Sequence, residues 1–185
     1  PGLVLAVSPR VAVHQTTGLA NLFLLPSSIN LLPADEDLRG KYDRQYRMKK
    51  MLAEFKDYFE YIFIDCSPSL VLLTLNALVA SDSVIIPVQC EYLALEGLGK
   101  ILNTIKMTEN QLNPEIEIEG FLMTMYDSRL RLANLVVEEV RKHFGHLVFE
   151  TVIPRNTRLS EAPSYGKPVL LHAAASSGAM NYLCL

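Results

Sequence analysis

A single carboxylate follows an apolar run in the first half of the chain. Residues 61–64 are Tyr-Ile-Phe-Ile, an apolar and strand-forming sequence, and Asp65 comes directly after them. One chemical role for such a group is Mg²⁺ binding, because this ion is typically held by one or two carboxylates together with waters and substrate phosphates. The structural alternative is that Asp65 caps the next helix by accepting a backbone hydrogen bond. Position alone slightly favours the structural alternative.

A Mg²⁺–nucleotide site of the P-loop type also requires the sequence G-x-x-x-x-G-K-[S/T], whose backbone N–H groups surround the phosphates. The chain contains three Gly-Lys pairs, beginning at positions 40, 99 and 166. None has the first glycine, and none is followed by Ser or Thr. These 185 residues therefore contain no P-loop motif.

The composition indicates a globular, soluble protein. Half of the residues are hydrophobic, a fifth are charged, and 185 residues suffice for one domain with a full core. No apolar run approaches the roughly 18 residues that a membrane span needs. The start of the chain is too short and too poorly charged for a signal peptide. The cysteines, Cys66, Cys90 and Cys184, fit neither a disulfide framework nor a zinc site, so we expect a cytoplasmic location.

Charge is unevenly distributed along the chain. The net charge of −3 alone argues against a general nucleic-acid binder. Residues 1–120 hold 10 Lys and Arg against 15 Asp and Glu, whereas residues 121–185 hold 7 against 5. The C-terminal part is therefore the expected place for an anionic partner.

Strand-like and helix-like segments alternate along the sequence. Apolar runs predict strands at 21–28, 61–65, 83–89, 116–126 and 148–154. Helical spacing predicts helices at 37–59, 70–80, 93–110 and 132–145, and a last helix begins near residue 176. Strands that are apolar on both faces are typical of an α/β fold, with a mostly parallel twisted sheet and helices on both faces.

Two consequences of this organisation concern particular side chains. Functional groups in such folds gather at the carboxyl ends of the strands, where the sequence places Asp65, Gln89, Asp127 and the loop 154–158. The helix after residue 131 is expected to turn four apolar residues to the core: Leu132, Leu135, Val136 and Val140.

Three long segments resemble the ParA/Soj family of chromosome-partitioning ATPases. They are YIFIDCSPSLVLLTLNALVASDSVIIPVQCEYLALEGL (61–98), GFLMTMYDSR (120–129) and VFETVIPRNTRLSEAPSYGKPVLL (148–171). The resemblance implies a P-loop NTPase fold of the ParA/MinD type with a deviant Walker A loop. It implies binding of ATP and Mg²⁺ and an ATP-dependent homodimer that binds double-stranded DNA nonspecifically. It also implies a ParB/Spo0J-type partner that stimulates hydrolysis, and a place on the nucleoid rather than at the membrane.

The family's Lys-Gly-Gly-x-Gly-Lys-Thr loop has no counterpart in this chain, because residues 1–20 do not resemble it. The resemblance therefore implies a single partial ATPase domain over residues 1–185, truncated at its N-terminus and without the P-loop strand and helix. We expect this chain alone to be inactive in ATP hydrolysis.

The resemblance also assigns roles to individual residues. Asp65 is similar to the Walker B acid, a catalytic residue that would hold Mg²⁺ through water. The nucleotide-binding candidates are Met125, Pro154, Arg155 and Asn156, and the dimer-interface candidates are Gln89, Glu91, Tyr92 and Glu96. The DNA-binding candidates are Arg129, Arg131, Arg141, Lys142, Arg158 and Lys167.

Each set has a structural alternative. The loop at 153–158 can be an ordinary turn, and Met125 is as well suited to a core role. Glu91 can simply favour a helix N-terminus. Because Glu138 and Glu139 share the helix of Arg141, those cations can form an ordinary solvated face.

Two other functions remain open beside a partitioning ATPase for a chromosome or plasmid. One is a non-catalytic DNA- or partner-binding remnant without a P-loop. The other is a MinD-like membrane-associated positioning ATPase. The segments 87–98 and 153–166 favour ParA over MinD.

Overall fold

The computed structural model describes residues 14–15, 21–27, 34–66 and 72–185. The chain divides into two compact units. Unit 1 contains residues 1–82 and 104–116, and unit 2 contains residues 83–103 and 117–185. Among the described residues, no helix is both long and apolar enough to cross a membrane.

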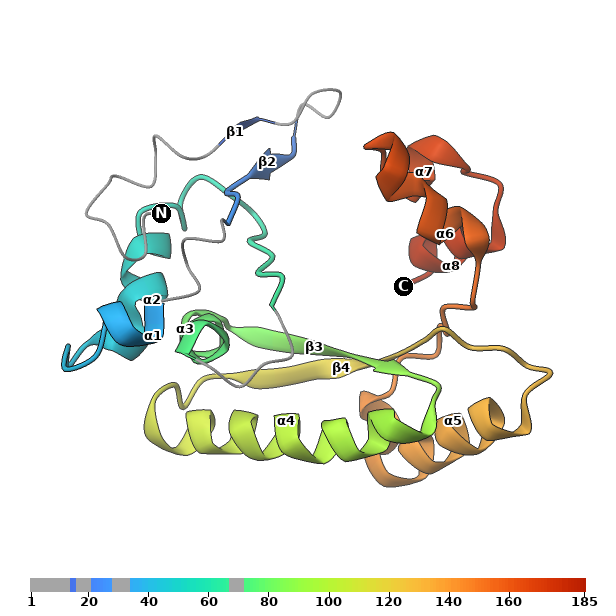
Figure 1. The fold of residues 1–185 in the computed structure, drawn as a ribbon, viewed down its shortest axis with the longest axis horizontal. Helices are drawn as coiled ribbons and strands as arrows, with labels where there is room; N and C mark the ends of the chain where they lie inside the picture. The colour runs from blue at the N-terminus through green and yellow to red at the C-terminus, as the bar shows by residue number, and fades with distance from the viewer. Residues whose placement is uncertain (1–13, 16–20, 28–33, 67–71) are drawn as a thin grey trace. The chain divides into compact units, whose positions relative to one another are not determined.

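Unit 2 is built on two parallel strands, β3 (Ser83–Gln89) and β4 (Glu117–Thr124) (Figure 1). A parallel pair requires a crossover connection, and α4 (Tyr92–Gln111) provides it. The buried side chains of β4 include Phe121 and Met123, which are fully buried. Both predicted strands and the predicted crossover helix are confirmed.

The segment 148–154 runs beside β4 without forming a regular strand. Two isolated parallel bridges, Phe121 to Val148 and Tyr126 to Pro154, join it to β4 and the loop after β4. Between these bridges the Val152 carbonyl accepts a hydrogen bond from α8 (Ser177–Leu183). The predicted strand is therefore wrong as a regular strand, although its parallel direction is as expected and its Phe149 and Ile153 amides donate to the Phe121 and Met123 carbonyls of β4.

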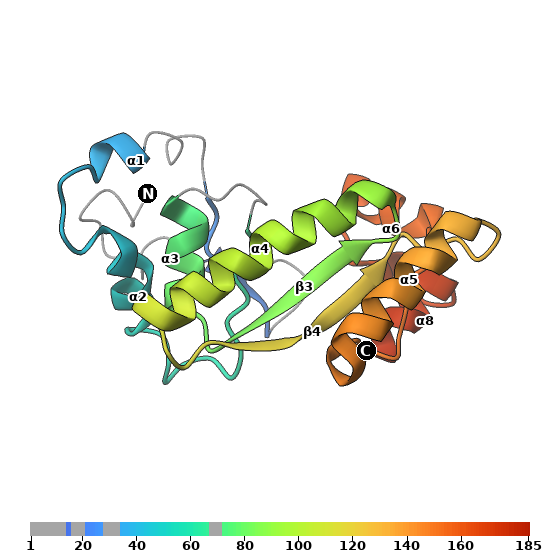
Figure 2. The same cartoon turned by 90° about the horizontal axis from the view of Figure 1, so that it is seen from below.

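Helices lie on both sides of the β3–β4 pair (Figures 1 and 2). Helices α4 and α5 (Arg131–Phe144) lie on one side, and the Phe144 ring packs 4.3 Å from the ring of Phe121. The other side carries α8 and two shorter helices, α6 (Thr157–Glu161) and α7 (Val169–His172). Two 3₁₀ turns, η4 (Gly145–Leu147) and η5 (Ala162–Tyr165), complete the unit. This arrangement confirms the predicted α/β class.

The buried face of α5 differs from the predicted one. Its buried residues are Ala133, Val136, Val137 and Val140. These follow the i, i+3, i+4, i+7 spacing of one continuous helical stripe. Leu132 and Leu135 lie beside that stripe and are 47% and 48% exposed, so their predicted core positions are wrong.

Unit 1 is centred on α3 (Leu72–Ala80), most of which is buried, as the sequence predicts. The buried Asn76 side chain bonds this helix to the preceding segment, which contains η3 (Arg44–Tyr46) and α2 (Arg47–Leu52). The unit also contains α1 (Ala34–Asp37).

Three predictions for unit 1 are wrong. The helix expected over 37–59 is helical only at its start, in the last residue of α1, and at 44–52, because Gly40 adopts a φ of 79° and turns follow Leu52. The buried strand expected at 21–28 is the two-residue β2 (Phe23–Leu24), which is exposed and pairs antiparallel with β1 (His14–Gln15).

The strand expected at 61–65 is also absent. Residues 61–66 have no regular secondary structure, and Phe63 is 85% exposed. A strand is stabilised by hydrogen bonds to a neighbouring strand, and this segment belongs to no sheet among the described residues.

Candidate functional site

Three loops of unit 2 meet at the carboxyl ends of β3 and β4. The Cys90 amide, just after β3, donates a hydrogen bond of 3.0 Å to the Thr124 carbonyl at the end of β4. The Arg155 amide donates a bond of 2.9 Å to the Tyr126 carbonyl. These backbone bonds bring residues 89–92, 125–127 and 153–156 to one edge of the sheet, as the sequence predicts for Gln89, Asp127 and the loop that begins at Pro154.

An ion pair joins two of these loops. Arg155 donates from Nη2 to Oε1 of Glu91 across 3.0 Å. The side chains are 54% and 56% exposed, so the pair is accessible to solvent and to a ligand. It connects a predicted nucleotide-binding residue with a predicted dimer-interface residue.

Two apolar side chains, Met125 and Pro154, lie at this edge of the sheet and are partly accessible to solvent. Met125 is 39% exposed, and its φ of 55° makes it the one non-glycine residue with a positive φ among the described residues. Such backbone conformations are uncommon outside glycine and cluster at functional sites. Pro154, bridged to Tyr126, is half-buried. The exposure of Met125 argues against the core role that the sequence left open, and both residues offer apolar surface to a flat ring.

Asn156 has a structural role in this structure. Its Oδ1 accepts a hydrogen bond from the Arg158 amide and so caps α6, while its Nδ2 donates to the Ser177 hydroxyl at the start of α8. Both polar groups of the side-chain amide are thus engaged within the chain. A role for Asn156 in reading a base stays a prediction, and it would use the second Nδ2 hydrogen or the second lone pair of Oδ1.

Asp127 is held by the guanidinium of Arg129. Nη2 and Nε of Arg129 donate to the two carboxylate oxygens at 2.7 and 2.9 Å. The hydrogen bonds from the Arg129 side chain, then from its backbone, lower the pKa of Asp127 to about 2, and the charge of Arg155 contributes further. Arg129, predicted to contact DNA, is therefore already paired with a carboxylate. Sequence reasoning placed Asp127 at this edge but gave it no role.

The other predicted DNA-binding residues are all exposed on α5, α6 and the loop after η5: Arg131, Arg141, Lys142, Arg158 and Lys167. Arg158 pairs with Glu161 at 2.8 Å, and Lys142 lies 4.0 Å from Glu139. Exposed pairs of this kind are worth about 0–1 kcal/mol, so phosphates can replace the carboxylates.

The predicted dimer-interface residues at the start of α4 combine apolar and charged groups. Tyr92 and Leu93 are 71% and 75% exposed. Glu96 pairs with Lys100 one turn later at 2.8 Å, and Gln89 is exposed at the end of β3. Exposed aromatic and aliphatic side chains beside charged ones are typical of protein interfaces.

Asp65, the predicted magnesium residue, is exposed and lies in the irregular segment 61–66 of unit 1. An exposed carboxylate can accept hydrogen bonds from the water shell of Mg²⁺. No group of three or more His, Cys, Asp or Glu side chains among the described residues could hold a metal ion. Mg²⁺ at Asp65 therefore fits only if waters and phosphates supply its other ligands, which is the usual coordination of this ion beside nucleotides.

Comparison with known proteins places the chain among partitioning proteins. Residues 5–118 match the family model described as an AAA domain. The chain is 50% identical over 175 residues to the sporulation initiation inhibitor protein Soj of Bacillus subtilis, covering 95% of this chain and 69% of that protein. It is 48% identical to the chromosome partitioning protein ParA of Myxococcus xanthus, covering 96% of this chain and 62% of that protein. The chain thus spans somewhat over six-tenths of the length of these curated relatives.

Solved structures show the same fold. Cobyrinic acid a,c-diamide synthase from Mycobacterium smegmatis, with bound ADP and magnesium, is 34% identical with a TM-score of 0.80, covering 97% of this chain and 65% of that one. The cell division ATPase MinD of Pyrococcus furiosus is 20% identical with a TM-score of 0.75, covering 98% and 70%. The predicted P-loop NTPase fold of the ParA/MinD type is confirmed.

Proposed function

Since this chain belongs to the ParA/Soj family of P-loop chromosome-partitioning proteins, we propose that its protein is an ATP- and Mg²⁺-dependent ATPase that partitions chromosome or plasmid DNA. The observation that carries this proposal is identity of 48% and 49%, over 96% and 92% of the chain, to two proteins named for chromosome partitioning.

The proposed base-binding residues all belong to unit 2, and the proposed magnesium residue, Asp65, belongs to unit 1. Met125 and Pro154 cover one face of the base, and Arg155 and Asn156 provide hydrogen-bonding groups. Asp65 orients Mg²⁺ through water. The bound nucleotide and Mg²⁺ supply the phosphates and the charge on which phosphoryl transfer depends.

One proposed interaction surface adjoins the base-binding residues, because Glu91 pairs with Arg155. Gln89, Glu91, Tyr92 and Glu96 form the interface of an ATP-dependent homodimer. The exposed cations of α5, α6 and the loop after η5 contact the phosphates of double-stranded DNA without reading its sequence. A ParB/Spo0J-type protein stimulates hydrolysis, and the protein acts on the nucleoid in the cytoplasm.

The first experiment concerns the 185-residue chain. We expect no steady ATP turnover, because it lacks a P-loop to position the phosphates. Turnover that Asp65→Ala abolishes would contradict this expectation.

The second experiment uses the product of the complete reading frame that encodes this chain. A product with a P-loop should bind random-sequence duplex DNA only with ATP and Mg²⁺, and Asp65→Ala should remove hydrolysis and weaken this ATP-dependent DNA binding. A product without a P-loop that binds DNA equally with and without ATP would favour the non-catalytic remnant instead.

A further inference from the structure

Residues 39–50 of unit 1 form a strongly basic segment. The sequence RGKYDRQYRMKK holds six cations, Arg39, Lys41, Arg44, Arg47, Lys49 and Lys50, and one acid, Asp43. This is a net charge of +5 within twelve residues of a chain whose total is −3. No other twelve-residue stretch of the sequence has so high a net positive charge. The basic segment lies outside the C-terminal part that is proposed to bind duplex DNA.

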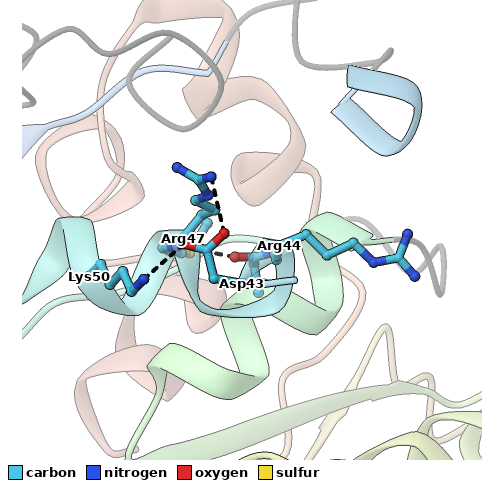
Figure 3. A network of polar contacts seen from close by, with 6 residues as sticks. Asp43, Arg44, Arg47 and Lys50 are labelled. Atoms are coloured by element: carbon cyan, nitrogen blue, oxygen red, sulfur yellow. Dashed lines mark hydrogen bonds and ion pairs between the residues drawn. The ribbon is translucent and has the colours of Figure 1, made fainter. Parts of the chain in front are cut away.

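Most of this charge is available to a ligand. Asp43 pairs with Arg47 at 3.1 Å and with Lys50 at 2.8 Å, and these contacts, the Lys50 hydrogen bond first, lower the pKa of Asp43 (Figure 3). Figure 3 shows the Arg44 side chain pointing away from this carboxylate. Among the described residues no carboxylate pairs with Arg39, Lys41, Arg44 or Lys49. Asp43 therefore forms ion pairs with two of the six cations, Arg47 and Lys50.

An aromatic ring stands among these cations. Tyr42, between Lys41 and Asp43, is 93% exposed, the highest value of any exposed large hydrophobic or aromatic residue described. It follows Gly40, whose positive φ turns the chain at this point. A tyrosine that is almost fully exposed contributes no burial to the fold, so its ring is free to stack on a planar group.

The basic segment is held in place by α3. The fully buried Asn76 donates from Nδ2 to the Arg44 carbonyl at 2.8 Å, and its Oδ1 accepts from the Met48 amide at 3.1 Å. These two bonds fix the backbone on either side of Arg47. A ligand therefore meets a partly preorganised array of charges, which lowers the entropic cost of binding.

We propose that the basic segment binds single-stranded nucleic acid, with the Tyr42 ring stacked on a base and the cations on the flanking phosphates. Cationic grooves with exposed aromatic rings are the usual surface for single strands, because every unpaired base offers a flat face. In a duplex these faces are already stacked on one another, so Tyr42 could not use them. This ligand and this surface are independent of the ATP-dependent duplex binding proposed above.

The test measures fluorescence anisotropy of labelled 20-nucleotide single strands and of the matching duplex, with the 185-residue chain at several salt concentrations. Tyr42→Ala should weaken single-strand binding about fivefold or more. Tyr42→Phe, which keeps the ring, should bind like the parent. Lys41→Ala should reduce the salt slope for single strands by about 0.7. Arms with DNA and RNA of one sequence distinguish which strand is preferred.

Two control variants match these changes outside the basic segment. Tyr61→Ala, at a tyrosine that is 72% exposed, is the control for Tyr42→Ala. Lys106→Ala, at an exposed lysine, is the control for Lys41→Ala. Both control variants should bind single strands like the parent. Absence of single-strand binding by the parent at low salt would overturn the proposal. Equal weakening by Tyr61→Ala, or a Tyr42→Ala variant that binds like the parent, would also overturn it. Stronger binding of the duplex with the same sensitivity to Tyr42→Ala would do so as well.

Discussion

Arg155 and Glu91 contact each other across 3.0 Å although 64 positions separate them in the sequence. The pair joins the loop after β3 to the loop 153–156, which lies beside the end of β4. Glu91 is therefore next to the proposed base-binding residues, and Arg155 is next to the proposed dimer interface. A ligand that takes the Nη2 group of Arg155 therefore competes with Glu91. This relationship links the proposed base-binding loop to the proposed dimer interface.

The contribution of this pair to folding should be small. Because both side chains are more than half exposed, we expect a coupling free energy of about 0.2–1 kcal/mol that falls as salt is added. A double-mutant cycle with Glu91→Ala and Arg155→Ala, followed by urea unfolding, measures it. A coupling well above this range, or one insensitive to salt, would contradict the picture of an easily opened contact.

Asn76 should matter much more for stability. Its side chain makes three hydrogen bonds inside unit 1, to the Met48 amide and to the Arg44 and Leu72 carbonyls. Asn76→Ala removes the side-chain partner of the Met48 amide and of the Arg44 carbonyl, and it should lower the free energy of unfolding by about 1–3 kcal/mol. The exposed Asn103 supplies the matched control, since Asn103→Ala should change stability by less than about 0.5 kcal/mol. Equal effects of the two variants in urea unfolding would refute this role.

Two glycines should respond to alanine in opposite directions. A Cβ at Gly120 would lie 2.8 Å from Cε2 of Phe149 and 2.9 Å from the Leu147 carbonyl oxygen. Since backbone cannot move as a side-chain end can, Gly120→Ala should destabilise the protein by about 1–3 kcal/mol. At Gly99, inside α4, no atom beyond the adjoining backbone of the helix lies within 4 Å of the added carbon, so Gly99→Ala should stabilise by about 0.5–1 kcal/mol. Thermal unfolding of both variants measures the contrast, and a shift of the same sign in both would be inconsistent with this packing.

Asp127 should give unfolding a dependence on acid. Its pKa falls from 3.8 to about 2 in the folded chain, mainly through the Arg129 side chain. Because the folded state favours the carboxylate, the stabilisation is complete above about pH 4 and is lost as the pH falls toward 2. Asp127→Asn should therefore flatten the change in melting temperature across that window, whereas Asp57→Asn, at an exposed position with no ion pair to a described residue, serves as the control. Identical pH profiles for Asp127→Asn and the parent would show that the Arg129 pair does not form in solution.

Sequence patterns correctly predicted β3 and β4, the two strands of unit 2 that pair with each other. The strands at 83–89 and 117–124 and the crossover between them are continuous, strongly periodic segments, and they form as expected. The run at 61–64 has the same composition but no strand beside it among the described residues, so its apolar character did not produce a strand. Leu132 and Leu135 illustrate a finer limit, because composition does not say which of two adjacent helical stripes faces the sheet.

Individual contacts of the candidate site were less predictable. The sequence indicated that Asp65, Gln89, Asp127 and the loop 154–158 would lie at the carboxyl ends of strands. Gln89, Asp127 and the start of that loop share such an edge, whereas Asp65 follows an irregular segment and not a strand. Sequence reasoning did not indicate that Asn156 caps α6 while bonding to Ser177, or that Arg129 pairs with Asp127. The contact between Arg129 and Asp127 is local, since the two residues are two positions apart. The sequence pattern that could have indicated it is Asp-x-Arg directly after a strand.

The last prediction concerns the proposed duplex DNA surface. Arg141 and Arg158 are both exposed, and their present contacts are weak: Arg141 donates to the Glu150 carbonyl at 3.3 Å, and Arg158 pairs with Glu161. In a product of the complete reading frame that binds ATP, each change to Ala should weaken binding to a random-sequence duplex and reduce the salt slope by about 0.9. Nucleotide affinity should stay the same.

A third change at this surface should strengthen duplex binding instead of weakening it. Glu161→Gln removes the carboxylate that now competes for Arg158, and it should therefore strengthen duplex binding, whereas Lys106→Ala, far along the sequence from this surface, should have no effect. A solvated face without a role in binding predicts no change for any of the four variants. Weaker binding for both arginine variants together with stronger binding for Glu161→Gln cannot come from a general loss of folding, because that would weaken binding in all three. Titrations by fluorescence anisotropy at several salt concentrations, with ATP present, separate these outcomes.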